Sequence, residues 1–201
     1  MIGRGTLLKL YQEKKLSVST IAKQLKCSQH QVNYWLSKFK IPKRSISDAL
    51  YEMWNPAGDP FKVSFPRTIN EAILYGIGIG LYWGEGTKAN RGSIRLGNSD
   101  PKLISIFIQF LVKCYGIQTK KLRFGLQIFG DMNKTEAIRY WMRLLRAPRQ
   151  QFLPTIVVTP HRGIGNYRRK TRYGILTVYF NNKKLRDILC NAIEGVAKGS
   201  T

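Results

Sequence analysis

The sequence has few acidic residues and no long apolar run. Of its 201 residues only 11 are Asp or Glu, against 34 Lys or Arg, which gives a formal net charge of +23. The positive charges are spread along the chain, so they argue against an acidic protein class and indicate a polyanionic partner, most often nucleic acid. The longest apolar run, residues 72–83, is shorter than the roughly 18 residues that indicate a membrane-spanning helix. No membrane partner is expected.

Cysteine and histidine are also scarce. Cys27, Cys114 and Cys190 lie far apart without a CxxC pair, and His30 and His161 are the only histidines. A zinc site or a disulfide framework is therefore not expected, and the cysteines are interpreted as small core residues. The first residues contain no clean apolar stretch and no cleavage signal. Together these features favour a cytoplasmic protein that is associated with the nucleoid when it binds DNA.

The first part of the chain carries a pattern of three short helices. An amphipathic helix is predicted over residues 5–15, a second helix is capped by Ser17 or Ser19, and a third is capped by Ser28. The turn between the last two helices, residues 26–28, is too short for antiparallel packing. These two helices should therefore cross steeply, as in a helix-turn-helix unit.

The apolar positions of this segment resemble the helix-turn-helix family of invertases and transcription regulators. The matching residues are Ile21, Ala22, Leu25, Cys27, Ser28, Val32, Trp35 and Leu36, followed by a basic run at 42–44. The resemblance implies that the third helix enters the major groove, where Gln and Asn suit adenine edges. The candidate DNA-binding residues are Gln29, His30, Asn33, Tyr34, Lys43 and Arg44. A helical hairpin used for protein contact is the alternative.

Residues 45–66 differ in composition and are interpreted as a linker. They contain three prolines and three of the 11 acidic residues, and they carry at most one short helix, over residues 47–53. The chain is thus divided into a helix-turn-helix domain at residues 1–44, this linker, and a second domain at residues 67–201.

The second domain opens with a glycine-rich apolar segment. Thr68 and Glu71 form a capping box ahead of the apolar run, which predicts a helix. Gly76, Gly80 and Gly84 fall four residues apart on one face of that helix. The alternation of Gly76, Gly78 and Gly80 argues against a helix, because a period of two residues is typical of a strand. Each helical glycine costs about 1 kcal/mol relative to alanine, so close packing of a second helix is expected to offset the cost.

The predicted helix ends beside Glu85, where the negative end of the helix dipole disfavours an anion. A compensating cation is expected there, and a divalent metal ion is the obvious candidate. Residues 78–86, GIGLYWGEG, resemble the nine-residue motif of the LAGLIDADG homing endonucleases. They match its glycine, leucine, small and acidic positions and its final glycine, whereas Gly78 and Trp83 depart from it. The resemblance implies that Glu85 is the catalytic acid and binds Mg²⁺.

The remaining elements extend this resemblance over about residues 67–201. The patterns predict strands at 93–97, 120–129, 156–159 and 173–180 and helices at 101–115, 134–146 and 183–196. This order resembles the αββαββα unit of the family, with the helix at 134–146 as an insertion. The resemblance implies an antiparallel sheet that lies in the major groove. The fold class expected for the whole chain is α+β, with a helical N-terminal domain.

Basic residues follow the strands and loops of this second domain. The outward positions and sheet loops supply Arg91, Arg95, Lys120, Lys121 and Arg123, and the loop at 161–173 supplies Arg162, Arg168, Arg169, Lys170 and Arg172. Both groups are predicted to bind the DNA backbone, with a solvated basic loop as the alternative for the second group. Lys88 and Gln127 are weaker candidates for supporting catalysis beside Glu85.

One motif supplies one acid, whereas the family places the metal ions between the acids of two packed motifs. The leading hypothesis is therefore sequence-specific binding and Mg²⁺-dependent cleavage of double-stranded DNA by a homodimer. The resemblance and the glycine spacing place the dimer contact at Gly76, Gly80 and Gly84. Two alternatives stay open: a DNA-binding transcriptional regulator that keeps the fold without cleavage, and an RNA-binding or splicing accessory.

Overall fold

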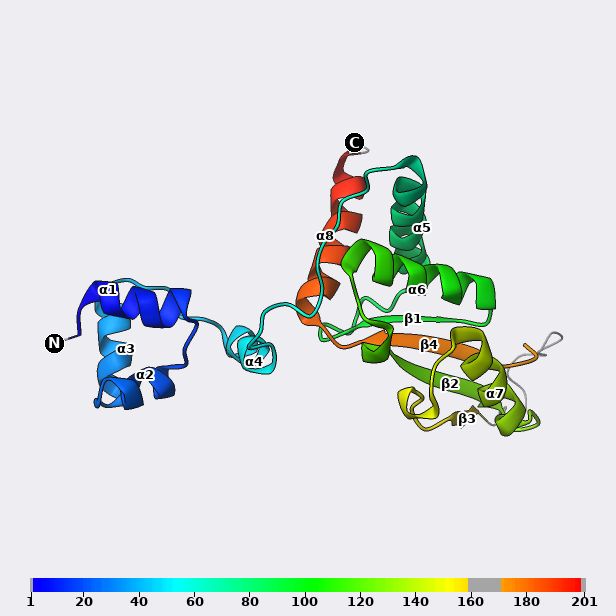
Figure 1. The fold of residues 1–201 in the computed structure, drawn as a ribbon, viewed down its shortest axis with the longest axis horizontal. Coiled ribbons are helices and arrows are strands. Elements are labelled where there is room, and N and C mark those ends of the chain that lie inside the picture. The colour runs from blue at the N-terminus through cyan, green and yellow to red at the C-terminus, as the bar shows by residue number, and fades with distance from the viewer. Residues whose placement is uncertain (1, 159–170, 200–201) are drawn as a thin grey trace. The chain divides into compact units, whose positions relative to one another are not determined.

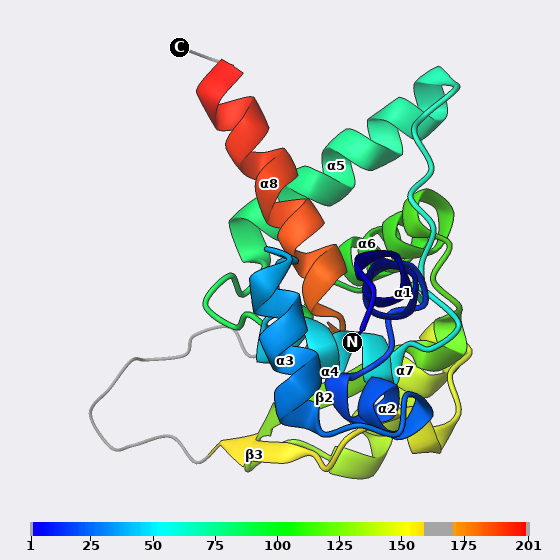
Figure 2. The ribbon, with the colours of Figure 1, turned by 90° about the vertical axis from the view of Figure 1, so that its left-hand side faces the viewer.

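The structure, a computed structural model, describes residues 2–158 and 171–199 (Figures 1 and 2). The chain divides into two compact units, Met1–Pro60 and Phe61–Thr201. The predicted domains at 1–44 and 67–201 each lie within one unit, and the predicted linker is shared between the two. In the described part of the chain, no helix combines the length and the apolar character needed to cross a membrane.

The first unit consists of short helices around a small core. In chain order they are α1 (Arg4–Leu7), which continues as the π-helical η1 (Leu8–Glu13), α2 (Val18–Gln24), α3 (Gln29–Lys38) and α4 (Ile46–Trp54). The core holds Leu7, Ile21, Val32 and Leu36, all of them fully buried. The helices α2 and α3 cross steeply at the short turn that joins them (Figure 2).

Serine caps start α2 and α3 at positions that the sequence predicts. The Ser17 hydroxyl accepts a hydrogen bond from the Thr20 N–H at 3.0 Å. The Ser28 hydroxyl accepts from the Gln31 N–H at 3.1 Å, and the Gln31 side chain accepts from the Ser28 N–H at 3.2 Å. The first amides of a helix have no partner within it, so these side-chain bonds fix where each helix begins.

Helix ends use lysine or arginine where glycine is the usual residue. Within the described residues, the non-glycine residues with positive φ are Lys15, Lys26, Lys40 and Arg146, each just after a helix, with φ of 53°, 50°, 53° and 49°. The left-handed conformation costs a residue with a Cβ roughly 1 kcal/mol, but a cation interacts favourably with the negative end of the helix dipole. These four helix ends therefore cannot be predicted from the positions of glycine.

The predicted linker consists of two structured pieces. Its helix, α4, is one residue longer at each end than predicted, and Lys15 Nζ lies 2.8 Å from the Glu52 carboxylate, so an ion pair attaches α4 to the first unit. Residues 61–66 belong instead to the second unit, where the Ser64 N–H donates to the Cys114 carbonyl at 2.8 Å. The boundary between the units therefore falls within the predicted linker.

The second unit combines helices with a four-stranded sheet. Its elements are α5 (Ile69–Glu85), β1 (Ile94–Asn98), α6 (Pro101–Tyr115), η2 (Thr119–Lys121), β2 (Arg123–Phe129), α7 (Lys134–Leu145), η3 (Arg149–Gln151), β3 (Ile156–Val158), β4 (Ile175–Phe180) and α8 (Lys183–Gly199). Every helix and strand predicted between residues 67 and 201 is present, with bounds that shift by up to three residues.

The sheet has the strand order β1-β4-β2-β3. Strand β4 is antiparallel to β1 and β2, but β3 is parallel to β2. The prediction of a purely antiparallel sheet is therefore wrong, and the sheet is mixed. The reason is the connection between β2 and β3: it contains α7, and a connection of this length can return the chain to the starting end of the sheet, which a hairpin cannot do.

The glycine-rich segment is a helix, as its cap predicts. The Thr68 hydroxyl accepts from the Glu71 N–H at 3.2 Å, while the Glu71 carboxylate accepts from the Arg67 N–H at 2.7 Å. In the predicted capping box the Glu71 side chain would accept from the Thr68 N–H. The structure has it accept from the N–H of the preceding residue, Arg67. Gly78 faces the core, where an added Cβ would lie 2.1 Å from the Phe110 ring. This glycine allows α5 to approach α6 closely.

Replacing Gly78 with alanine is expected to lower the free energy of unfolding by about 1–3 kcal/mol, because the added methyl overlaps a buried ring. The gain in helix propensity, about 1 kcal/mol, does not offset that overlap. Gly195→Ala in α8 is the matched control: no atom outside its own helix lies within 4 Å of the added Cβ. The control should be stabilised by up to about 1 kcal/mol. Chemical denaturation followed by circular dichroism measures both, and equal stabilisation of both variants would contradict the packing at Gly78.

Candidate nucleic-acid interface

The outer face of the sheet is lined by aligned residues from three strands, most of them polar or glycine. Side chains alternate along each strand, so the positions between the buried residues form this second face. The register places Arg95 of β1 and Arg123 of β2 on either side of Tyr179 in β4. The Arg95 guanidinium lies over the Tyr179 ring, 5.4 Å from its centroid. Arg123 donates to the Lys120 and Leu122 carbonyls, at 2.9 Å in each case.

The middle of this face is uncharged and shallow. Thr177 lies between Gly97 and Gly125, and an added Cβ on Gly125 would lie 2.9 Å from the Tyr179 ring. The glycines therefore leave room for the threonine and tyrosine side chains to lie across the sheet. The next row contains Ile175, Gln127 and Ile156. This strip carries no charged side chain.

Cations gather at the end of the outer face where β1 and β2 begin. Strands β1 and β2 are both antiparallel to β4, so their first residues lie at the same end of the sheet. The exposed residues Arg91, Lys120 and Lys121 precede these strands. At the other end, before β4, Arg172 is exposed and its guanidinium lies 5.2 Å from the Tyr173 ring centroid. The predicted contacts Arg162, Arg168, Arg169 and Lys170 lie outside the described residues.

Glu85 lies at the outer edge of β1. It is the last residue of α5, and the next residue, Gly86, forms an antiparallel bridge with Leu96. The Thr87 N–H donates to the Arg95 carbonyl at 2.9 Å. Gly86 is buried, like Leu96, whereas Glu85 and Thr87 are exposed. The Glu85 carboxylate has no hydrogen-bond or ion-pair partner among the described residues. It is free to bind a cation at the edge of the basic face.

Lys88 places a positive charge at the C-terminus of α5, beside Glu85. Its Nζ donates to the Trp83 carbonyl at 2.5 Å, so an ammonium group lies at the C-terminus of α5. The compensating charge predicted beside Glu85 is therefore supplied at least in part by Lys88. The dipole alone no longer requires a metal ion, and in the structure Lys88 caps the C-terminus of α5. The Lys88 carbonyl in turn accepts from Arg186 of α8 at 2.5 Å.

The packing beneath this loop is tight and apolar. Tyr82 is fully buried, and an added Cβ on Gly86 would lie 2.3 Å from its ring. Burial is the main cause that raises the pKa of Tyr82 to about 12, and the neighbouring Cys190 adds to the shift. This phenol therefore stays neutral and serves as a packing group. It holds the loop after Glu85 in place.

Gln127 is separated from Glu85. It lies on the outer face of β2, while Glu85 lies beyond the far edge of β1, with β4 between the two strands. The spacing of strands and residues puts the two about 15 Å apart within one chain. The structure therefore does not support a role for Gln127 at the Glu85 carboxylate of the same chain. Gln127 stays a candidate contact to base edges on the outer face.

One chain does not offer a complete metal site. Among the described residues there is no group of three or more His, Cys, Asp or Glu side chains that could hold a metal ion. A carboxylate oxygen is a suitable ligand for Mg²⁺, which keeps several waters and takes one or two carboxylates. Glu85 offers one such ligand.

The face of α5 that points away from α6 is apolar and open. No atom outside the helix backbone lies within 4 Å of a Cβ added at Gly76, Gly80 or Gly84. Around them, large apolar side chains are exposed: Ile69 by 80%, Ile73 by 54%, Ile77 by 44% and Trp83 by 48%. The predicted packing partner of the glycine stripe is therefore absent from the described part of the chain, and this apolar face is exposed.

In the first unit, α3 presents the side chains predicted to bind DNA. Gln29, His30 and Tyr34 are exposed and Asn33 is half-buried. Lys38 lies on the same helix, and its Nζ lies 5.7 Å from the Tyr34 ring centroid and 4.9 Å from that of Trp35.

The two basic residues after α3 are separated by the structure. Lys43 is exposed, whereas Arg44 is half-buried and donates to the Lys15 and Leu16 carbonyls at 2.8 and 2.5 Å. The Arg44 guanidinium also lies 4.4 Å from the Tyr11 ring centroid. Arg44 therefore links the end of η1 to the segment after α3, and its guanidinium is already bonded to backbone carbonyls.

Comparison with protein-family models, with curated proteins and with solved structures finds no match for this chain.

Proposed function

We propose that the protein binds double-stranded DNA with the outer face of its sheet and cleaves it, with Mg²⁺, as a homodimer. One observation carries this proposal: Arg95 and Arg123 are aligned across one end of the outer face, next to a neutral strip, with the free Glu85 carboxylate at the edge. Cations at the end of the strands suit a phosphate backbone that borders a groove, while a neutral centre suits base edges. The excess of positive charge along the chain supports the same partner.

The order of elements supports the likeness to the LAGLIDADG unit. When the bridge between Gly86 and Leu96 is counted as a short first strand, α5 is followed by two antiparallel strands and α6. Strands β2 and β4 and helix α8 then complete an αββαββα order, with α7 and β3 inserted between β2 and β4. The inserted strand β3 pairs in parallel with β2, and this pairing is what makes the sheet differ from the predicted antiparallel one.

The first unit adds a second contact with DNA in this proposal. Its helices α2 and α3 resemble a helix-turn-helix, and Gln29 and Asn33 can form paired hydrogen bonds with adenine edges. Tyr34 and Lys38 extend that surface along α3, and Lys43 follows it. Two binding units on one chain raise the effective concentration of each for its site. The first unit would therefore add affinity and sequence selectivity.

Two Glu85 carboxylates from two chains would hold the metal. Bound Mg²⁺ supplies positive charge for the phosphoryl oxygens and lowers the pKa of a water molecule. The chain's own part is to orient Glu85, through the capped end of α5 and the bridge at Gly86, and to bind the flanking phosphates. A regulator without cleavage is the second candidate, because the described residues hold no group of three potential metal ligands.

Affinity for duplex DNA is expected to fall steeply with salt, and the Arg95→Gln/Arg123→Gln variant should bind more weakly with a flatter salt dependence. Each lost phosphate contact removes about 0.9 from the slope of log K against log salt, so the pair should remove up to about 1.8. Fluorescence anisotropy of labelled duplex DNA measures this. Arg139→Gln/Arg143→Gln, which removes equal charge from the exposed side of α7, is the control.

The proposal fails if the two double variants lose affinity equally, because the outer face would then have no special role. Competition with duplex RNA separates the RNA-binding alternative. If the protein prefers RNA, duplex RNA should displace the labelled DNA at a lower concentration than unlabelled duplex DNA does.

A further inference from the structure

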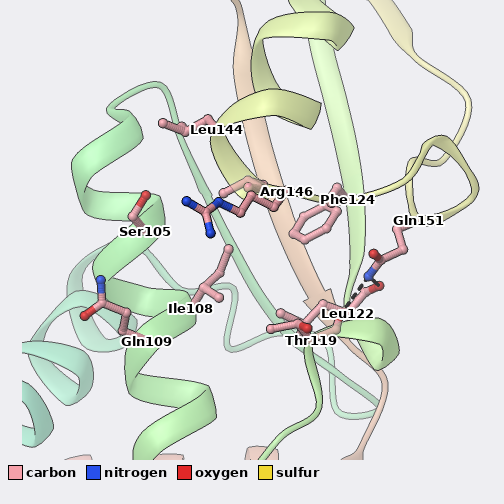
Figure 3. Close-up of a pocket in the computed structure, with 11 residues that line it drawn as sticks. Ser105, Ile108, Gln109, Thr119, Leu122, Phe124, Leu144, Arg146 and Gln151 are labelled. Atoms are coloured by element: carbon pink, nitrogen blue, oxygen red, sulfur yellow. Dashed lines mark hydrogen bonds between the residues drawn. The ribbon is translucent and has the colours of Figure 1, made fainter.

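A pocket separate from the outer face lies on the helix-covered side of β2. Its volume is about 260 Å³, and it is bordered by α6, by the end of α7 and by the start of β2 (Figure 3). Leu122 and Phe124 contribute to it from the buried side of the sheet, whereas Arg123 between them belongs to the outer face. A ligand in this pocket would therefore not compete with DNA for the same residues.

The walls of the pocket are mainly apolar and are held in place by the fold. Ile108, Phe124 and Leu144 line it from three different elements. Gln151 is 8% exposed, and its side chain donates to the Thr119 and Leu122 carbonyls at 2.7 and 2.9 Å. These two bonds fix the loop that forms one wall. The pocket is thus preformed, which reduces the entropy lost when a ligand binds.

Arg146 is exposed and places one positive charge at the rim of this pocket. Its side chain extends toward α6, near Ser105 and Ile108 (Figure 3). It has no hydrogen-bond or ion-pair partner among the described residues. Its φ of 49° is a conformation that glycine adopts at lower cost, so the backbone at this helix end does not require arginine. An unpaired guanidinium beside apolar walls is a recognition group for a planar anion.

We propose that this pocket binds a small aromatic carboxylate. The carboxylate pairs with the Arg146 guanidinium, and the ring lies against Phe124 and Leu144. An apolar cavity of about 150 Å³ holds benzene, so the observed volume accommodates one ring with a carboxylate. A single cation matches a monoanion, whereas a phosphate dianion would require further positive charges that the pocket lining does not contain.

Benzoate is the probe for this site, with benzyl alcohol as its uncharged analogue and inorganic phosphate as the anion without a ring. In heteronuclear NMR titrations of the full-length protein, benzoate should give saturable shifts at the amides of Ser105, Leu122 and Ala147, which line the pocket. Benzyl alcohol and phosphate should bind at least tenfold more weakly. Phosphate that matched benzoate would show that the charge alone is recognised and would overturn the proposal.

Arg146→Gly is the decisive variant, because glycine suits the left-handed backbone and the fold is retained. It should weaken benzoate binding at least tenfold and leave benzyl alcohol binding unchanged. Arg143→Ala, on the exposed last turn of α7, removes the same charge outside the pocket and should bind benzoate as the parent protein does. Equal benzoate affinity of the Arg146→Gly variant and the parent would overturn the proposal. No DNA is present, so the result is independent of the proposed nuclease activity.

Discussion

Glu85→Gln is expected to reduce Mg²⁺-dependent cleavage of duplex DNA about a thousandfold while affinity for DNA stays equal or rises. Glutamine keeps the shape of the side chain but loses the negative charge that binds the metal. A loss of about 4 kcal/mol of transition-state stabilisation corresponds to that factor. Affinity does not fall, because an anion beside the phosphates is removed. Cleavage assays on a plasmid or a random duplex library, paired with anisotropy, measure both quantities.

Glu136→Gln is the matched control for this experiment. Glu136 is an exposed acid in the first turn of α7, so the same chemical change is made outside the proposed site. It should cleave as the parent protein does. Normal cleavage by the Glu85→Gln variant would remove Glu85 from the mechanism. A parent protein that binds duplex DNA but does not cleave it with Mg²⁺ would support the regulator instead.

The helices of this protein could be predicted because their signals are local. Thr68, Ser17 and Ser28 each supply a cap within three residues of the backbone group that they satisfy. Such a bond depends on the chain nearby and on little else. The same holds for α6, which begins at Pro101 after Asp100 and ends at Gly116, as the sequence predicts.

Strand pairing could not be predicted from the same local signals. The alternation in β2 identifies its buried face, but β3 is too short to show a period, and nothing near it indicates that its partner is parallel. The outer face therefore contained residues that sequence reasoning missed. Tyr179 and Thr177 alternate with buried residues in β4, so their side of the sheet was predictable, but their alignment with Arg95 and Arg123 depends on the register.

Charge at the ends of helices was the least predictable feature of the site. The dipole argument required a cation near Glu85, and the structure places Lys88 there, three residues further along the chain. Arg44 shows the opposite case: its charge suggested a DNA contact, but backbone carbonyls bind its guanidinium. A sequence gives the charge of such a residue, but only the folded chain shows whether that charge is already satisfied.

Gly80→Leu is expected to abolish both dimer formation and cleavage while the monomer stays folded. Among the described residues, no atom outside the helix backbone lies within 4 Å of a Cβ added at Gly80, so there is room for a side chain to begin there. The leucine also replaces a poor helix former with a good one. Between two α5 helices the same leucine would prevent close approach. The two Glu85 carboxylates could then no longer hold one site between them.

Analytical ultracentrifugation with and without duplex DNA, together with the cleavage assay, tests this expectation. The parent protein should be a dimer when it is bound to DNA, with two chains on each duplex. Without DNA the dimer should be weaker, because a single helix face is a small interface. The Gly80→Leu variant should bind DNA as a monomer and cleave it no faster than the Glu85→Gln variant does. Gly195→Leu makes the same change on α8, where space is equally open, and should behave as the parent protein does. A Gly80→Leu variant that stays dimeric and cleaves normally would show that α5 does not form the dimer contact, and the second Glu85 would then have no route into the metal site.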